Sequence, residues 1–219
     1  KHTSLKDIAQ ALGVSVPTVS RALKDSPDIS RALCEKAKWM AREMNYRPNP
    51  FALSLRKNAP RIIGVVVPDI VTHFFASILN GIENMAVKNG YFVIITTSHE
   101  SYEHEKRNVE NLVNMRVEGI IACLSQETTD YTHFAELKDI NMPLIMFDRV
   151  CLTDQFSSVV ADGEHSAQMA TQHLLDNGCK RVAFIGGANH LDIVKRRKHG
   201  YLEALRNNKI PIEKELVVC

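Results

Sequence analysis

The chain has 219 residues, of which 45% are hydrophobic and 24% charged. This composition argues against a wholly disordered chain. No apolar run comes near the length of a membrane span, which is about 18 residues. The net charge of +2 is unevenly spread: residues 1–58 hold 11 Lys and Arg against 5 Asp and Glu, whereas residues 59–219 hold 16 against 20. A basic head on an acidic body predicts that the head meets a polyanion, with an uneven scatter of surface charge as the alternative.

The start of the chain has no apolar stretch typical of a secretory signal, and it lacks an initiator Met, which favours a trimmed N-terminus. The five cysteines are odd in number and show no C-x-x-C spacing. We therefore expect neither a disulfide framework nor a zinc module, and we expect a reducing cytoplasmic environment.

Residues 1–48 have the pattern of three short helices. Ser4, Ser15 and Ser30 each stand where a helix cap is needed, and Gly13 ends the first helix. Two short helices joined by Gly-Val-Ser and followed by a longer third are typical of a helix-turn-helix.

In this motif the second helix presents its N-terminal side chains to the major groove of DNA. Arg21 can donate two hydrogen bonds to guanine, while Val16 and Pro17 can contact a thymine methyl group. Hydroxyls or helix-end N–H groups can bind phosphates. The predicted DNA-reading residues are Ser15, Val16, Pro17, Thr18, Ser20, Arg21 and Ser30. Plain capping by Ser15 and a merely solvated Arg21 are the alternatives.

The stretches 5–9, 13–23 and 45–49 resemble the headpiece of the lactose-repressor family. The resemblance adds Leu5 to the DNA-contacting residues. It also implies a short hinge helix, capped by Asn49, that folds when paired with a second copy on the DNA minor groove. There Ala52 would allow close approach and Leu55 would be a wedge that bends the operator. For Leu55, one apolar residue in a linker is the alternative.

After residue 60, predicted strands alternate with predicted helices, which indicates a parallel, doubly wound α/β sheet. Ligands in such folds bind beyond the carboxyl ends of the strands. The helix over 74–88 should turn Ile78, Ile82, Met85 and Ala86 inward. The expected strands are 61–67, 91–96, 118–122, 144–147, 157–160, 181–185 and 216–218, and the expected helices are 74–88, 101–115, 131–140, 164–175 and 192–207.

Signals for catalysis are weak. Gly186-Gly187 lacks a phosphate-binding pattern, His104-Glu105 lacks the second His of a zincin motif, and no Gly-x-Ser-x-Gly occurs. We expect no catalytic residues, no metal, no cofactor and no enzymatic activity.

Five stretches of the body, 63–69, 73–75, 116–119, 147–149 and 197–201, resemble the effector domain of the same family, which shares its fold with periplasmic sugar-binding proteins. The resemblance implies that Phe74 and Phe75 flank a bound ring, that Asp148 binds a hydroxyl and that Arg197 binds hydroxyls or a carboxylate. Asp162, at a strand end, completes the expected effector site. The alternatives are core roles for the two phenylalanines, an Asp148–Arg149 pair, and a solvated charge run around Arg197.

The expected organisation is an all-α helix-turn-helix headpiece (1–48), a hinge (49–59), an incomplete N-terminal lobe of the effector domain (60–161) and the truncated start of its C-terminal lobe (162–219). The family's body crosses between lobes three times, and this sequence crosses once.

The expected function is a cytoplasmic, homodimeric transcriptional regulator. We expect a repressor that binds a pseudo-palindromic operator in double-stranded DNA, that makes no membrane contact, and that is allosterically controlled by a small effector, a sugar or its derivative. A sugar-binding protein without a DNA function and an inert truncated fragment are the alternatives.

Overall fold

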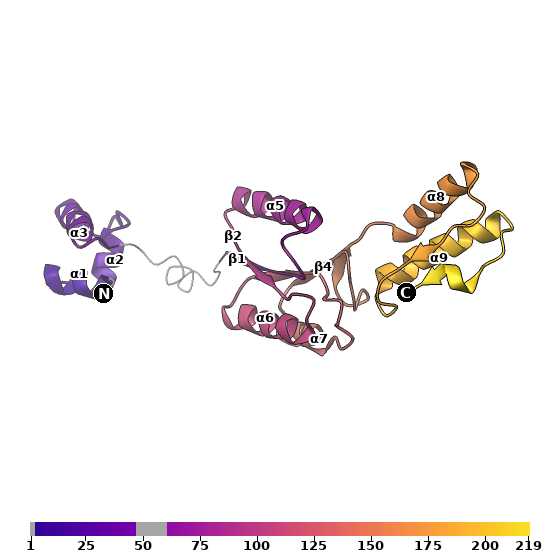
Figure 1. Cartoon of the computed structure of the whole chain (residues 1–219). Helices are drawn as coiled ribbons and strands as arrows, with labels where there is room; N and C mark the ends of the chain where they lie inside the picture. Colours follow the sequence, from indigo (N-terminus) through magenta and orange to yellow (C-terminus); the bar gives the residue numbers. More distant parts are fainter. Residues whose placement is uncertain (1–2, 47–60) are drawn as a thin grey trace. The chain divides into compact units, whose positions relative to one another are not determined.

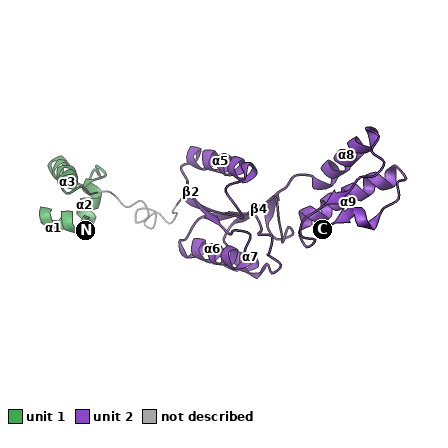
Figure 2. Cartoon of the chain, viewed as in Figure 1, with its two compact units in different colours: residues 1–59 green, residues 60–219 purple. Residues whose placement is uncertain are grey.

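The computed structural model describes residues 3–46 and 61–219. Contacts between Cα atoms divide the chain into two compact units, residues 1–59 and 60–219 (Figure 2). The expected hinge residues Asn49, Ala52 and Leu55 lie outside the described residues. Within the described part, no helix has both the length and the apolar character needed to cross a bilayer.

The first unit contains the three predicted helices: α1 (Leu5–Leu12), α2 (Val16–Ala22) and α3 (Arg31–Glu43). Ser4 begins α1 with a capping box, in which its hydroxyl accepts the Asp7 N–H and the Asp7 carboxylate accepts the Ser4 N–H. Gly13 ends α1 in the left-handed region, at φ 65°. Ile8, Val19 and Ala37, one from each helix, are fully buried. The predicted helix-turn-helix is therefore confirmed.

The first lobe of the second unit is built on a five-stranded sheet whose strand pairs are all parallel, in the order β2-β1-β3-β4-β5. This confirms the predicted doubly wound fold. Its strands are β1 (Ile62–Val67), β2 (Phe92–Thr97), β3 (Gly119–Ala122), β4 (Leu144–Phe147) and β5 (Ser157–Val159).

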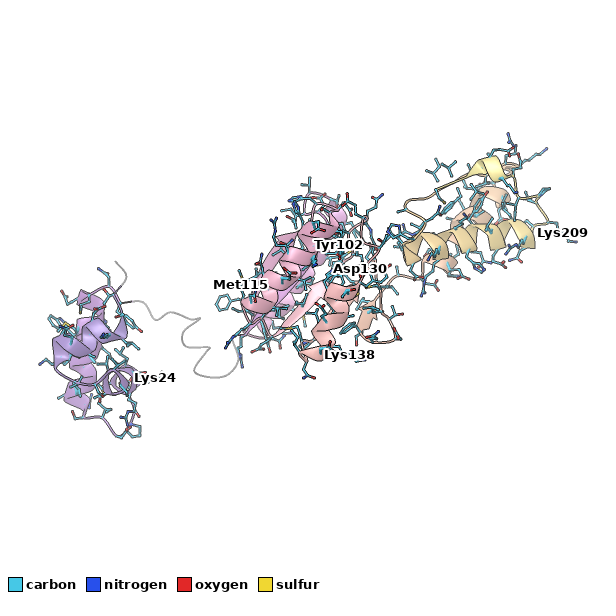
Figure 3. The ribbon with its side chains drawn as sticks, turned by 90° about the horizontal axis from the view of Figure 1, so that it is seen from below. Lys24, Tyr102, Met115, Asp130, Lys138 and Lys209 are labelled. Carbon is cyan, nitrogen blue, oxygen red and sulfur yellow. The ribbon has the colours of Figure 1, made fainter. Side chains whose placement is uncertain are left out.

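Helices cover both faces of this sheet (Figure 1). On one face α5 (His73–Lys88) packs on the apolar side chains of β1, where Val65 and Val67 are fully buried. On the other face lie α6 (Tyr102–Asn114) and α7 (Thr132–Asp139), against Val66. In Figure 3 Tyr102 and Asp130 lie near each other at one end of α6, and the Tyr102 hydroxyl donates to the Asp130 carboxylate over 3.1 Å.

One orientation expected on α5 is wrong. Ile78 and Ile82 pack on the sheet and Ala86 is buried, but the Met85 side chain is 60% exposed. Beyond its first turn, α5 buries only a narrow stripe, so a residue next to that stripe remains in solvent.

The second lobe consists of α8 (Gly163–Asp176), α9 (Asp192–Asn207), a 3-10 turn (Lys214–Leu216) and a parallel pair formed by β6 (Phe184–Ile185) and β7 (Val217–Val218). The strand expected over 181–185 is shorter than predicted, because β7 offers only two residues for pairing. The two helices touch at Gly200, where a Cβ atom would lie 2.0 Å from the Glu164 carbonyl oxygen.

We expect Gly200→Ala to destabilise the second lobe. The added methyl group would collide with backbone atoms of α8, which cannot move aside as a flexible side chain can. The free energy of unfolding should fall by about 2 kcal/mol or more, measured by urea denaturation followed by circular dichroism.

Gly81→Ala is the matched control, because Gly81 is also within a helix and nothing lies within 4 Å of its added Cβ. It should raise the free energy of unfolding by about 0.5 kcal/mol through helix propensity. Equal effects of the two variants would contradict the close packing of α8 on α9.

Candidate functional site

The exposed face of α2 carries three of the residues predicted to contact DNA. The side chains of Val16, Pro17 and Arg21 are exposed. Ser15 is the N-cap of α2 and its hydroxyl accepts the Thr18 N–H over 3.3 Å. Ser30 caps α3 in the same way, by accepting the Leu33 N–H over 3.4 Å. Both serines therefore position the helices, whichever other contacts they make.

The expectation that Ser20 points away from the apolar face of α2 is wrong, because only 6% of the residue is exposed. The reason is that α2 packs on both α1 and α3, so a seven-residue helix has only a narrow stripe left for solvent. Leu5 is half-buried and packs in the cluster around Ile8.

Arg21 is not merely solvated. Its NH1 group donates to the Asp28 Oδ2 atom over 2.7 Å, and both side chains remain about half exposed, at 53% and 50%. Asp28 lies in the turn between α2 and α3, so the pair joins the exposed face of α2 to that turn.

In the second unit, a cavity of about 330 Å³ lies beyond the carboxyl ends of the first lobe's strands, between that lobe and α9. Phe74 and Phe75, at the start of α5, are stacked edge to face with ring centroids 5.2 Å apart. Phe75 is 6% exposed and belongs to the core, whereas Phe74 is 50% exposed. The cavity is lined by Phe74, Phe75, Gln126, Asp148, Arg149, Gly187, Ala188, Leu191, Ile193, Val194 and Arg197.

Asp148 stands directly after β4 in a left-handed conformation, at φ 56°. Burial raises the pKa of this carboxyl, and the charges of Arg149 and Arg197 partly oppose that rise. The alternative that Asp148 pairs with its neighbour is wrong, because the Arg149 guanidinium donates to Glu100 over 2.7 Å. Asp148 lines the cavity, where its carboxylate can accept hydrogen bonds.

Arg197 lies on α9 and forms part of the opposite wall of the cavity. Four of the five expected effector residues therefore come together: Phe74, Phe75, Asp148 and Arg197. The fifth, Asp162, does not line the cavity; its carboxylate caps α8 by accepting the His165 N–H over 3.0 Å. A helix cap and a strand end look alike in the sequence, because both place an acidic residue between two elements.

A buried polar network that the sequence did not reveal fixes the loop after β3. The Glu105 carboxylate, fully buried, accepts the Ser125 N–H over 2.6 Å and the Thr128 hydroxyl over 2.8 Å. The His133 Nε2 atom lies 3.0 Å from the same carboxylate. The Ser125 hydroxyl in turn donates to Ser98 over 2.6 Å. This network holds in place the loop that carries Gln126 to the cavity.

Glu100 joins two parts of the cavity rim. One of its oxygens accepts both the Gln126 N–H and the Arg149 guanidinium, each over 2.7 Å. Sequence reasoning missed Gln126 and the turn after β6, although the rule that ligands meet the carboxyl ends of strands would have pointed to Gly187 and Ala188.

The described residues contain no group of three or more His, Cys, Asp or Glu side chains that could hold a metal ion. In the core cluster that contains Phe75 and Phe147, burial raises the pKa of the Cys123 thiol to about 12, so this cysteine stays in its unreactive form near neutral pH.

Comparison with known families decides the relationship. Residues 61–218 match the family described as periplasmic binding proteins and sugar binding domain of LacI family, and residues 4–49 match bacterial regulatory proteins, lacI family. The chain belongs to the LacI family. Both matches agree with the resemblance carried by the sequence motifs.

Individual relatives support the assignment. Catabolite control protein A of Priestia megaterium is 31% identical over 222 residues, which cover 99% of this chain and 65% of that protein. A Lac repressor dimer bound to operator and the anti-inducer ONPF is similar in structure, with a TM-score of 0.74 and 26% identity over 96% of this chain and 64% of that chain. The transcriptional regulator CelR in complex with cellobiose has a TM-score of 0.65 and 25% identity, covering 99% and 65%. The LacI-family chain thus spans slightly less than two thirds of these relatives, and their names are those of regulators rather than enzymes.

We expect Glu105→Ala to destabilise the first lobe. The substitution would leave the Ser125 N–H and the Thr128 hydroxyl buried without their acceptor. The free energy of unfolding should fall by about 3 kcal/mol in urea denaturation. Glu110→Ala, at an exposed position of the same helix, should change it by less than about 0.5 kcal/mol. A near-neutral Glu105→Ala would contradict the structural role of the network.

Proposed function

We propose that this LacI-family protein is a sequence-specific DNA-binding transcriptional regulator, acting as a repressor. The observation that carries the proposal is the face of α2, on which Val16, Pro17 and Arg21 are exposed beside a Ser15-capped start. An arginine fork reads guanine in the major groove, and apolar side chains contact thymine methyl groups. Three further residues are proposed to contact the sugar-phosphate backbone of DNA: Thr18 in α2, Ser30 at the start of α3 and Leu5 at the start of α1.

A homodimer would present two such heads to a pseudo-palindromic operator, with recognition helices about 34 Å apart in successive major grooves. The similar Lac repressor, solved as a dimer on its operator, supports this assembly. The segment with Asn49, Ala52 and Leu55 is proposed to be the minor-groove hinge between the units. A regulator of bacterial operators works in the cytoplasm, where the DNA is.

The cavity of the second unit is proposed to bind a small effector, a sugar or its derivative. Its volume of about 330 Å³ lies at the lower end of the range for small-molecule sites. The exposed Phe74 ring suits the C–H face of a sugar, the Asp148 carboxylate accepts from hydroxyls, and Arg197 donates to them. CelR, a similar regulator, was solved with cellobiose, which supports this ligand class. The proposed role involves no catalysis and no cofactor.

Control by the effector requires that it bind two states of the protein with different affinity. A ligand that contacts both the strand ends of the first lobe and α9 of the second favours the state in which these walls are close. By linkage, operator DNA and effector then change each other's affinity by the same factor.

A sugar-binding protein without a DNA function is the competing proposal, and the cavity alone would suit it equally well. The variant Arg21→Ala, in the head, distinguishes the DNA-binding regulator from the sugar-binding protein. From a library of random duplexes, the full chain should select a consensus that contains guanine. Arg21→Ala should lose about tenfold or more of the preference for that consensus over random duplex, at fixed salt, because the guanine contact is gone.

Lys24→Ala is the matched control, since Lys24 is exposed just beyond α2 and also carries one positive charge. It should weaken binding to all duplexes alike and leave the preference unchanged. Failure of the full chain to select any consensus would reject the proposed function.

For the effector site, we expect Arg197→Ala to abolish the ligand-induced rise in melting temperature that a panel of monosaccharides and disaccharides reveals in the unmodified chain. The substitution removes the hydrogen-bond donors on the α9 wall. Lys195→Ala is the control, because Lys195 is exposed on the same helix and does not line the cavity. Equal ligand-induced shifts in both variants would contradict the assignment of Arg197.

A further inference from the structure

The turn between α2 and α3 places a carboxylate against the arginine proposed to read DNA. The Arg21 NH1 group donates to Asp28 over 2.7 Å. No second hydrogen bond of the Arg21 guanidinium is seen among residues 3–46 and 61–219, so one carboxylate oxygen holds one nitrogen and the rest of the planar fork remains open.

The Asp28 carboxylate is itself held in place. Its other oxygen, Oδ1, accepts the Ser26 hydroxyl. The Ser26 hydroxyl, followed by the Asp28 backbone N–H and by Arg21, keeps the pKa of this carboxyl below its usual value. Asp28 therefore keeps its negative charge at neutral pH, and the turn fixes the position of that charge.

A second acid of the same turn behaves differently. The Asp25 carboxylate accepts the Lys38 ammonium group of α3 through both oxygens, over 2.6 and 2.7 Å. This pair ties the turn to α3. The two acids have equal charge and lie three residues apart. Only Asp28 forms a hydrogen bond with Arg21, whereas Asp25 is paired with Lys38.

A carboxylate near a DNA-binding face repels phosphates and so lowers the affinity for DNA. A gain in selectivity between DNA sequences would compensate for that loss. A free arginine binds phosphate as readily as guanine, and phosphate contacts carry no sequence information. An arginine whose charge is balanced by a fixed carboxylate gains less from phosphate. It also loses less conformational entropy when it meets a base, because one end of the fork is already held.

We propose that Asp28 is a specificity-determining residue that positions Arg21 for guanine and weakens its attraction to phosphate. Asp28 acts through Arg21 and not by a base contact of its own. The inference rests on the proposed function of α2 and adds the residue that sets how selective its arginine is. An acid at this place lowers binding to random DNA more than binding to the operator.

The test uses the full chain and the variants Asp28→Asn, Asp25→Asn, Arg21→Ala and the double variant Arg21→Ala with Asp28→Asn. The probes are the duplex selected from a random library by the unmodified chain, the same duplex with each guanine replaced in turn, and a random duplex. Binding is followed by fluorescence anisotropy at several salt concentrations. Circular dichroism checks that each variant keeps its helices.

Asp28→Asn is expected to bind random duplex more tightly, with a salt dependence steeper by about one phosphate contact. At the guanine where Arg21→Ala loses discrimination, Asp28→Asn should lose about fivefold or more of it. Asp25→Asn should strengthen binding to all duplexes alike without changing that ratio. In the Arg21→Ala background, Asp28→Asn should leave the discrimination unaltered, which a purely structural role would not predict.

Ser26→Ala keeps the charge of Asp28 but removes the hydrogen bond that fixes it, and should lose part of the discrimination without the gain on random duplex. The inference is overturned if Asp28→Asn tightens binding to every duplex by one factor, since Asp28 would then be only a competing charge. It is also overturned if the loss persists without Arg21. A chain that selects no duplex at all overturns the proposed function, and this inference with it, so the two failures are distinguishable.

Discussion

The cavity end of the second unit depends on one buried carboxylate, that of Glu105. It is removed from water, which is costly unless its lone pairs are satisfied, and the Ser125 N–H and the Thr128 hydroxyl satisfy them. The loop after β3 is thereby restricted to one shape. Glu100 then joins that loop to the end of β4 by accepting from both Gln126 and Arg149. One wall of the cavity is therefore held in place by hydrogen bonds within the first lobe.

The opposite wall has a different origin. It is formed by α9 and by the turn after β6, which belong to the second lobe. The helices α9 and α8 pack closely at Gly200, with no room for a larger side chain between their backbones. An effector that contacts both walls binds one rigid surface on each lobe, and this is the arrangement that a shift between two states requires.

In the head, ion pairs hold the turn between α2 and α3 in place. Each acid of the turn between α2 and α3 is matched with a base, Asp28 with Arg21 and Asp25 with Lys38. Exposed pairs of this kind contribute little to stability. The proposed role of the Asp28–Arg21 pair is in binding, because a neutralised arginine favours directed hydrogen bonds over diffuse attraction to phosphate.

The sequence by itself determined the order of the elements, the helix caps at Ser4, Ser15 and Ser30 and the parallel fold, because these depend on periodicity and on hydrogen bonds between residues a few positions apart. The family followed from the resemblance of short motifs in the head and the body. It misjudged the orientations of Ser20 and Met85 and did not reveal that Asp162 caps α8, because these surroundings are set by the packing of neighbouring elements. Only the tertiary structure showed that Phe75 is buried while Phe74, beside it in the cavity wall, is half exposed, and only it paired Arg149 with Glu100, 49 residues away. Contacts between distant residues follow from how helices and strands pack, and no local pattern contains that information.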